Sequence, residues 1–401
     1  MSILAESVSG YLGNASWIRR MFEEGAALKK QYGAENVYDF SLGNPDLPAP
    51  PAVGKALLEF CGHAGEPFAF GYMPNGGFMH LREKLAEYIS REQGVKLGAD
   101  CVIITNGAAG ALNVFLRATL NPGDEVLTFA PYFVEYGFYC ENHQGRLVPV
   151  KSRPDTFKPD LGALEAAIND KTRVVLLNSP HNPTGVIYNK QEMAAIAHLL
   201  ENKTQEYGHP IWLCVDEPYR FLAYDGIQVP PVLGLYPYSV IISSLSKNLS
   251  MPGERIGWIA VSPKLAQKEE LMAGLTLANR ILGFVNPPVI GQRILEKVLG
   301  ENVDISIYAN RRKAMAEVLT NAGYEFQMPA GAFYFFPKAP GGDDVAFVRE
   351  LVKERILAVP GSGFGCPGYF RLAFCVDESV IRGAEAGFRR AREAFNSKRS
   401  A

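Results

Sequence analysis

The sequence predicts an α/β fold, in which a mostly parallel sheet lies between helices, joined to a smaller α+β domain. Between residues 100 and 261, short apolar runs alternate with longer segments of helical character. The last third of the chain instead opens with a long helical segment and places a few strand-like runs among helices. With 401 residues the chain is longer than one simple core requires, so two domains are expected.

Six short apolar runs carry the prediction of the sheet. They are rich in β-branched residues and are followed by turn-forming residues. Continuous apolarity without alternation is what a strand buried on both faces of a sheet requires. The runs are 101–104, 125–129, 174–177, 211–215, 240–242 and 256–261.

Helical stretches separate the apolar runs, which is the pattern of a mostly parallel sheet covered on both sides. These helices are expected at about 109–120, 191–201 and 263–277. In the C-terminal third, helices are expected at 303–321, 344–354 and 378–395, and strands at 332–336, 356–359 and 369–374. Helices and a small sheet segregated in this way indicate a separate α+β domain.

The composition excludes several classes of function. The formal net charge is −2 and there is no run of Lys or Arg to neutralise the phosphates of a nucleic acid, so no such partner is expected. No run of about 18 apolar residues is present to cross a membrane. Residues 1–20 lack a charged start followed by an apolar stretch, so we expect no secretory signal and a cytoplasmic location.

Cysteines and histidines show no pattern of a metal site. The six cysteines lie far apart without a C-x-x-C pair, and the six histidines form no H-x-x-x-H or Cys/His cluster. No metal is therefore expected. Cys101 and Cys214 lie inside apolar runs, where a buried, reduced thiol is the expected state.

Lys247 lies in a segment whose side chains suit a phosphate group. Residues 243–258 follow an apolar run and precede another strand, a place where strands deliver residues to a ligand crevice. Ser244 and Ser246 precede the lysine and Arg255 follows it. Hydroxyls and a guanidinium suit a dianionic phosphate, because arginine offers paired charge-assisted donors. The alternative is a surface lysine beside a turn.

Three further segments place polar or small residues at strand ends. Residues 178–185 (N-S-P-H-N-P-T-G) close one run and, taken alone, are compatible with a plain turn. Asp216 ends a strongly apolar strand, with Tyr219 three residues on, and a carboxylate at such depth requires a cationic partner. Residues 105–112 open a helix with small residues, which leaves backbone N–H groups free to meet an anion. That segment is not G-x-G-x-x-G and no acidic ribose partner is evident, so a dinucleotide site is disfavoured.

Together these segments resemble the fold-type I enzymes that depend on pyridoxal 5′-phosphate (PLP), specifically the aspartate aminotransferase-like class I and II aminotransferase family. The resemblance covers essentially the whole chain. Its motifs, in order, are L-G-N-P-D (42–46), F-G-Y-M-P-N-G-G (70–77), H-N-P-T-G (181–185), D-x-x-Y (216–219), S-x-S-K (244–247) with Arg255, and F-R-L-A-F (370–374). Any one motif is weak, but the ordered set is highly specific.

The resemblance also implies an architecture. The large domain of this PLP-dependent transferase fold contains a mostly parallel seven-stranded sheet and would span residues 45–288. The small domain would be discontinuous, formed by residues 1–44 and 289–401. The cofactor would lie at the crevice between the domains and at a dimer interface.

Lys247, Asp216 and Tyr219 are the catalytic residues that the resemblance implies. Lys247 would form a Schiff base with PLP and move the substrate α-proton as general base and acid. Asp216 would pair with the protonated pyridine nitrogen and keep the ring a good electron sink. Unit charges about 4 Å apart attract by about 4 kcal/mol at an effective dielectric of 20, enough to keep that nitrogen protonated. Tyr219 and Asn182 would hydrogen-bond the phenolic oxygen of the cofactor.

The remaining implied cofactor contacts hold the phosphate and one face of the ring. Phe133 would stack on the ring. Tyr72 would donate its hydroxyl to the phosphate bound by the neighbouring subunit of a homodimer. The other phosphate contacts would come from the loop and hydroxyl residues Gly107, Ala108, Ala109, Ser244, Ser246 and Arg255.

Arg371 is implied as the residue that binds the substrate α-carboxylate, helped by Asn182 and the backbone at Gly43. The alternative for Arg371 is a strand-edge salt bridge. Many family members have a hydroxyl residue or a lysine where this chain has Ala109, so one route for binding a distal carboxylate is absent. Arg280 lies near an arginine of dicarboxylate-specific members, but its spacing is one residue off, and otherwise it is a helix-end surface cation.

The expected activity is transfer of an amino group from an L-amino acid to a 2-oxo acid by a ping-pong mechanism. Two alternatives remain open at this point. A PLP-dependent C–S β-lyase of the same fold would use the same lysine. A PLP-sensing transcription regulator would need a DNA-binding extension before the enzyme-like domain. The motif that contains Gly43 lies too close to the start of the sequence to leave room for such an extension. The sequence does not discriminate among aspartate, aromatic and aliphatic amino donors.

Overall fold

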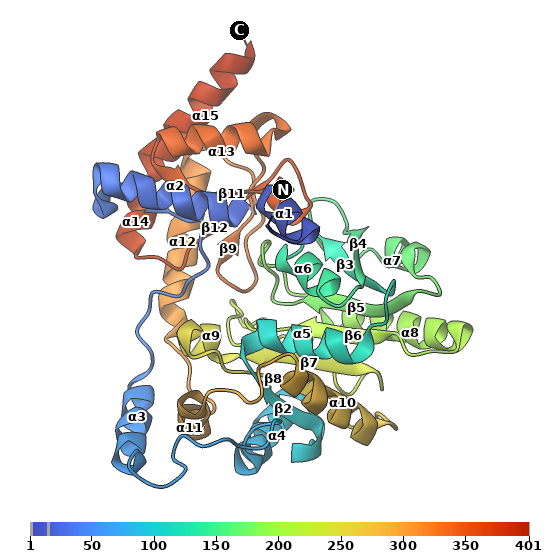
Figure 1. The fold of residues 1–401 in the computed structure, drawn as a ribbon. Coiled ribbons are helices and arrows are strands. Elements are labelled where there is room, and N and C mark those ends of the chain that lie inside the picture. Colours follow the sequence, from blue (N-terminus) through green and yellow to red (C-terminus); the bar gives the residue numbers. More distant parts are fainter. Residues whose placement is uncertain (1–2, 14–16, 401) are drawn as a thin grey trace.

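The computed structural model describes residues 3–13 and 17–400, and it confirms the predicted α/β architecture (Figure 1). In this part of the chain a seven-stranded sheet has the strand order β2-β8-β7-β6-β5-β3-β4. Strand β8 is antiparallel to both of its neighbours, and all other adjacent strands are parallel. The strands are β2 (Val102–Thr105), β3 (Glu125–Ala130), β4 (Arg146–Lys151), β5 (Thr172–Asn178), β6 (Trp212–Asp216), β7 (Ser239–Ser244) and β8 (Gly257–Val261).

Strand β4 is the strand that the six apolar runs do not include. Its sequence R-L-V-P-V-K carries Pro149, and Val150 is its buried residue. Because β4 lies at the edge of the sheet, one side of its backbone needs no partner strand, and an edge position tolerates proline and polar residues. The central strands β6, β7 and β8 are instead buried along their whole length, as their continuous apolar sequences predict.

Helices pack on the sheet as the alternating pattern predicts. Helix α5 packs on β7 and β8, α8 on β6, α4 and α10 on β2, and α6 and α7 on β4. Helix α8 begins with a capping box, in which Asn189 and Glu192 satisfy each other's backbone N–H groups, and it ends at the left-handed Gly208. The helices of this part are α3 (Pro51–His63), α4 (Met79–Gln93), α5 (Gly107–Thr119), α6 (Glu135–Glu141), α7 (Leu161–Ala167), α8 (Lys190–Tyr207), α9 (Leu245–Asn248), α10 (Lys268–Ile281) and α11 (Val289–Val298).

A second, smaller group of helices and strands lies above the large sheet in Figure 1. Strands β11, β12 and β9 form an antiparallel sheet in that order, and β1 pairs in parallel with β10. The expected helix over 378–395 is two helices, which separate at Ala384. The elements are α1 (Glu6–Gly13), α2 (Trp17–Tyr32), β1 (Tyr38–Asp39), α12 (Ile305–Asn321), β9 (Tyr334–Phe335), α13 (Asp344–Lys353), β10 (Ile356–Leu357), β11 (Val359–Pro360), β12 (Phe370–Ala373), α14 (Glu378–Gly383) and α15 (Glu385–Ser400).

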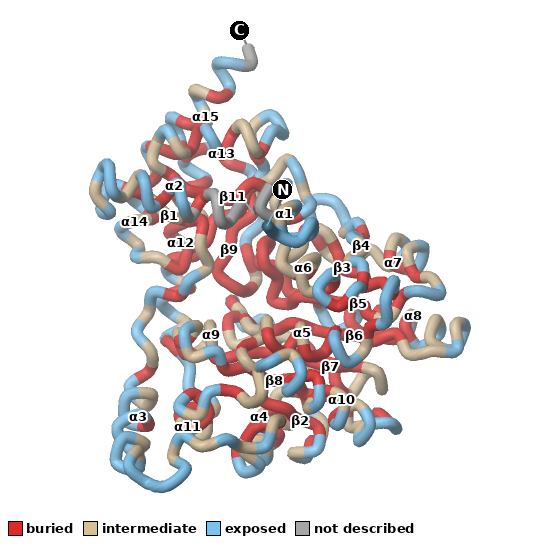
Figure 2. Tube along the Cα trace, viewed as in Figure 1, coloured by how far each residue is buried: buried red, intermediate tan, exposed pale blue. Residues whose placement is uncertain are grey.

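The central strands of the large sheet are buried (Figure 2), and their carboxyl ends carry buried polar residues. Asn178 ends β5 directly opposite Asp216, which ends β6, and Ser244 ends β7. In open α/β sheets this edge is where ligands bind. Among the described residues, no helix has the length and apolarity needed to cross a membrane.

Candidate active site

A cavity of about 310 Å³ lies at the carboxyl ends of β5, β6 and β7. Its size is in the range of small-molecule sites. Twelve of the residues that the sequence assigned to cofactor or substrate line it: Gly43, Ala108, Ala109, Phe133, Asn182, Asp216, Tyr219, Ser244, Ser246, Lys247, Arg255 and Arg371. The rest of the lining is Leu112, Tyr136, Tyr139, Asn178, Pro218, Pro252 and Tyr334.

Three residues that the sequence analysis considered do not line this cavity: Gly107, Tyr72 and Arg280. Gly107 lies beneath Arg255: it has φ +74°, and a Cβ atom there would lie 2.7 Å from Arg255 Nη2. Glycine therefore lets the guanidinium approach the start of α5. Tyr72 is 93% exposed in the loop before α4 and does not line the cavity of its own subunit. Arg280, in the last turn of α10, is also exposed and outside the cavity.

Lys247 has the environment of a reactive amine. Its Nζ donates a hydrogen bond to Gly43 O at 2.6 Å and lies 5.5 Å from the centre of the Phe333 ring. Burial, together with the nearby charges of Arg371 and Arg255, lowers the pKa of Lys247 to about 8. The fraction of neutral amine, the nucleophilic and basic form, is therefore far larger near neutral pH than for an ordinary lysine, and it reaches about one half near pH 8.

One carboxylate oxygen of Asp216 is hydrogen-bonded, and the other has no partner in the described part of the chain. Its Oδ2 accepts a hydrogen bond from Tyr136 Oη at 2.7 Å, whereas Oδ1 is buried and has no partner among the described residues. Burial raises the pKa of Asp216 to about 6, and the hydrogen bond from Tyr136 opposes that rise. A buried acceptor without a donor is costly, so this geometry fits a ligand that brings an N–H donor to Oδ1.

The opposite end of the cavity is suited to an anion. Ser244 caps the short helix α9 and accepts a hydrogen bond from the Ser246 backbone N–H at 3.3 Å. Arg255, with φ +53°, directs its guanidinium to the start of α5 and donates to Pro252 O at 2.9 Å. The first N–H groups of α5, at Ala108 and Ala109, have no partner within the helix and carry its positive end.

Arg371 is a buried cation placed for a carboxylate. It lies in β12 and donates to Asn182 Oδ1 at 3.1 Å and to Ser41 O at 2.5 Å. Its guanidinium carbon lies 4.8 Å from the centre of the Tyr334 ring and 4.9 Å from that of Phe364. Within the described part of the chain no acidic side chain pairs with it, and its Nε lacks a partner. Burial lowers its pKa. A buried guanidinium without a counter-ion favours an incoming carboxylate.

Three of the seven other lining residues, to which the sequence assigned no role of their own, make hydrogen bonds within the site. Tyr136, in the first turn of α6, donates a hydrogen bond to Asp216, and the sequence offered no specific signal for this role. Asn178 donates to the Asp216 backbone carbonyl at 2.7 Å and accepts from the Asn182 N–H at 2.6 Å, as its strand-end position allows. Tyr334 hydrogen-bonds Tyr219 across the cavity; its F-Y-F-F context indicated only a strand.

The cavity therefore matches PLP part by part. The unpartnered oxygen of Asp216 suits a protonated pyridine nitrogen, and the group of Ser244, Ser246, Arg255 and the start of α5 suits the phosphate. Lys247 lines the same cavity and supplies the amine that an aldehyde requires. Phe133, on the cavity wall, offers an aromatic face.

Comparison with known proteins agrees with this geometry. The family model described as aminotransferase class I and II matches residues 35–386. The aspartate/prephenate aminotransferase of Thermus thermophilus is 30% identical over 377 residues, which cover 91% of this chain and 93% of the relative. The aspartate aminotransferase of Thermotoga maritima is 31% identical over 365 residues, which cover 90% and 91%.

The structural comparison gives the same result. A crystal structure described as an amino transferase from Eubacterium rectale superimposes with a TM-score of 0.94 at 38% identity, and the match covers 99% of this chain and 100% of that one. The Thermotoga maritima aspartate aminotransferase superimposes with a TM-score of 0.85 at 29% identity, covering 98% and 100%. The chain therefore belongs to the class I and II aminotransferase family and is a PLP-dependent enzyme.

Proposed function

We propose that the cavity around Lys247 is the place where this aminotransferase moves an amino group from an L-amino acid to a 2-oxo acid. The observation that carries the proposal is the convergence of three side chains on one cavity. Lys247 is a buried amine with a lowered pKa, Asp216 has an open carboxylate oxygen, and Arg371 is a cation without a counter-ion. These are the groups needed to move a proton, hold a cationic ring nitrogen and bind an α-carboxylate.

Each group acts on a defined atom. When bound, PLP supplies an electron sink that stabilises negative charge at the substrate Cα. Arg371 would bind the α-carboxylate through charge-assisted N–H groups and so fix the orientation of the substrate Cα. Lys247 Nζ then takes the Cα proton, because its neutral amine is well populated near pH 8. Asp216 keeps its carboxylate charge directed at the ring nitrogen, and Tyr136 holds that orientation.

The test of this function is a half-reaction screen of the twenty amino acids with the purified holoenzyme. An amino donor should convert the cofactor spectrum in a single turnover and release its 2-oxo acid stoichiometrically. Addition of 2-oxoglutarate or pyruvate should restore the spectrum. Formation of pyruvate and ammonia from cystathionine, with no 2-oxo acceptor present, would instead favour the C–S β-lyase alternative.

Arg371→Ala is expected to raise KM for every amino-acid substrate by about 10–100-fold, since a charge-assisted hydrogen-bonded pair contributes about 1.5–3 kcal/mol. The effect should not depend on the substrate side chain, because the α-carboxylate is common to all. Steady-state kinetics with an aspartate, an aliphatic and an aromatic donor measure it. A loss confined to one donor class would contradict the proposed role.

Arg280 is proposed to bind the distal carboxylate of a dicarboxylate substrate. Because it lies outside the cavity of its own subunit, it would have to act on the site of a partner subunit. Several relatives are aspartate aminotransferases, and one Thermus thermophilus structure was solved with maleate, a dicarboxylate. In this chain the described cations that line the cavity are Lys247, Arg255 and Arg371, each with another proposed task. Arg280→Ala should therefore weaken dicarboxylate substrates only. Equal losses for aspartate and an aliphatic donor would show that Arg280 does not select the substrate.

A homodimer is proposed because a large apolar surface surrounds Tyr72. Helix α3 is rich in apolar residues, yet only Ala56 in it is buried (Figure 2). Asn75 donates to Val285 O, and Asn279 donates to Asn75 O, so the loop that carries Tyr72 is held beside the end of α10. Exposed apolar residues occur on α3, on this loop and on α4, α10 and α11, which pack beside them: Leu57, Leu58, Phe68, Phe70, Tyr72, Met79, Leu277, Ile281 and Ile290. A patch of this kind is typical of an interface, and a two-fold contact would bury it on both subunits.

Dilution of the holoenzyme is expected to release PLP and activity together, since Tyr72 would complete the phosphate site of the partner subunit. Sedimentation and cofactor absorbance measured over a dilution series report both. Tyr72→Phe should weaken PLP retention without separating the subunits, because it removes only the hydroxyl. A fully active monomer would contradict the shared site.

The domain division and the cellular location are also proposals. Pairing of β1 with β10 supports grouping the N-terminal residues 1–44 with the C-terminal part of the chain. Helix α11 packs against α3 and α4, which favours moving the second boundary of the large domain from residue 288 to the end of α11. All six cysteines are unpaired, as a reducing cytoplasm would keep them.

A further inference from the structure

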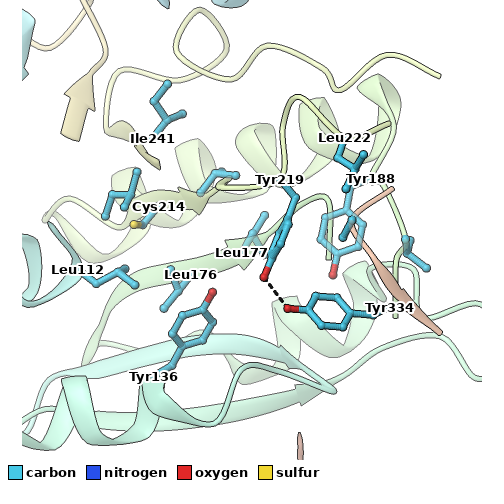
Figure 3. Packing of buried hydrophobic residues seen from close by; sticks show 14 of the residues in the cluster. Leu112, Tyr136, Leu176, Leu177, Tyr188, Cys214, Tyr219, Leu222, Ile241 and Tyr334 are labelled. Atoms are coloured by element: carbon cyan, nitrogen blue, oxygen red, sulfur yellow. Dashed lines mark hydrogen bonds between the residues drawn. The ribbon is translucent and has the colours of Figure 1, made fainter. Parts of the chain in front are cut away.

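Tyr334 connects two parts of the cavity through a single hydrogen bond. Its hydroxyl oxygen lies 2.7 Å from that of Tyr219, and Figure 3 shows the two rings meeting hydroxyl to hydroxyl. Tyr219 follows β6, which carries Asp216, whereas Tyr334 lies in β9, next to the strand that carries Arg371. The hydrogen bond therefore joins the proposed cofactor side of the cavity to the proposed substrate side.

The Tyr334 ring also contacts Arg371. The guanidinium carbon lies 4.8 Å from the ring centre, within the range of an attractive cation–π contact. Burial raises the pKa of Tyr334 to about 12, while the charge of Arg371 acts in the opposite direction. A cation at this position favours loss of the phenolic proton and so makes the Tyr334 O–H a stronger hydrogen-bond donor.

Gly43 lies against the same hydroxyl. A Cβ atom on Gly43 would lie 2.1 Å from Tyr334 Oη, so glycine is needed for the chain to pass this closely. Residues 41–43 also accept hydrogen bonds from Lys247, through Gly43 O, and from Arg371, through Ser41 O. Tyr334 is therefore in contact with Gly43 and Arg371, and its hydroxyl is hydrogen-bonded to that of Tyr219.

We propose that Tyr334 is a positioning residue that sets the donor strength of the Tyr219 hydroxyl and links it to the charge at Arg371. The inference rests on the proposed role of Tyr219 as a donor to the phenolic oxygen of the cofactor. A phenol has one O–H, so if Tyr219 donates to the ligand, Tyr334 must donate to Tyr219. When hydrogen bonds are linked in series in this way, each one strengthens the next by about 10–30%.

The other titratable groups that face this pair are Lys247, Asp216, Arg371 and Cys375. Burial raises the pKa values of Tyr219 and Cys375, as it does that of Tyr334, so the three are neutral near pH 7. A change in the cofactor spectrum near neutral pH therefore does not come from ionisation of the two tyrosines.

The test is a pH titration of the visible absorption of bound PLP in holoenzyme variants. Tyr219→Phe removes a direct donor to the ionised phenolic oxygen, so the midpoint should rise by about 1–2 pH units. Tyr334→Phe leaves the ring in place and weakens that donor, so the midpoint should rise by about a tenth to a third of that shift. The double variant should match Tyr219→Phe alone, because Tyr334 acts through Tyr219.

Tyr224→Phe is the matched control. Tyr224 is buried and donates to Ala332 O at 2.8 Å, two residues from Tyr334, so its variant removes a buried hydroxyl from the same region. The control should leave the midpoint unchanged. An equal shift in the control, no shift in Tyr334→Phe, or an additive double variant would each overturn the inference. Absence of a shift in Tyr219→Phe would instead refute the proposed role of Tyr219.

Discussion

Lys247→Ala is expected to abolish borohydride trapping of PLP and to lower kcat by at least about 10²–10⁴-fold, the range that a positioned general base contributes. Lys247 lines the same cavity as Asp216, with its open carboxylate oxygen, and Arg371. In the wild-type holoenzyme, borohydride should bleach the yellow colour and fix a pyridoxyl group on Lys247. Peptide mapping by mass spectrometry locates the label.

Lys264→Ala is the matched control for the lysine variant. Like Lys247, Lys264 donates to a backbone carbonyl, Gly234 O, at 2.6 Å, but it lies outside the cavity. This variant should retain both the colour and the activity. A pyridoxyl label on any lysine other than Lys247, or a protein without visible absorbance after reconstitution, would contradict the central assignment.

The pH dependence of cofactor capture follows from the same lysine. An amine attacks an aldehyde only in its neutral form, and the pKa of Lys247 is lowered from 10.5 to about 8, chiefly by burial. The rate at which the apoprotein captures PLP should therefore rise with pH through a midpoint near 8. A midpoint near 10.5 would mean that Lys247 is solvated like an ordinary surface lysine in the apoprotein.

The sheet was predictable because its central strands are buried on both faces. Strands β6, β7 and β8 contain short, uninterrupted apolar runs rich in β-branched residues and are buried along their whole length, as a strand covered on both faces requires. Strand β4 was missed for the opposite reason: at the sheet edge it needs only one buried residue and tolerates Pro149. The break between α14 and α15 was missed because helical periodicity continues across Ala384.

The lining residues were predictable where the chemistry determines the residue type. An acid at the end of an apolar strand, such as Asp216, and a lysine among hydroxyls, such as Lys247, are unusual without a ligand. Tyr136 and Tyr334 were not predictable, because an aromatic residue beside an apolar run is ordinary core. Their roles come from hydrogen bonds of their hydroxyl groups to Asp216 and to Tyr219. These hydrogen bonds depend on packing between segments that lie far apart in the chain.

Asp216→Asn is expected to retain PLP but to slow abstraction of the substrate α-proton by several orders of magnitude. Loss of one preorganised electrostatic contact alone costs about 10²–10³-fold. An amide can still hydrogen-bond Tyr136, but it carries no charge to keep the ring nitrogen protonated, so the electron sink is weakened. With a Cα-deuterated amino acid, the kinetic isotope effect of the variant should increase, because proton abstraction becomes the slow step.

A variant of a second buried carboxylate, Asp344, is the control that distinguishes this electrostatic role from a general loss of stability. Asp344 is buried and accepts hydrogen bonds from the Ser362 N–H at 2.6 Å and from the Gly368 N–H at 3.2 Å, away from the cavity. Asp344→Asn should therefore lower thermal stability and leave the rate of proton abstraction unchanged. Asp216→Asn should show the reverse pattern, a large loss in rate with a small change in Tm. Equal rate losses in the two variants, or a holoenzyme structure with Asp216 more than about 4 Å from the ring nitrogen, beyond ion-pair distance, would refute the assignment.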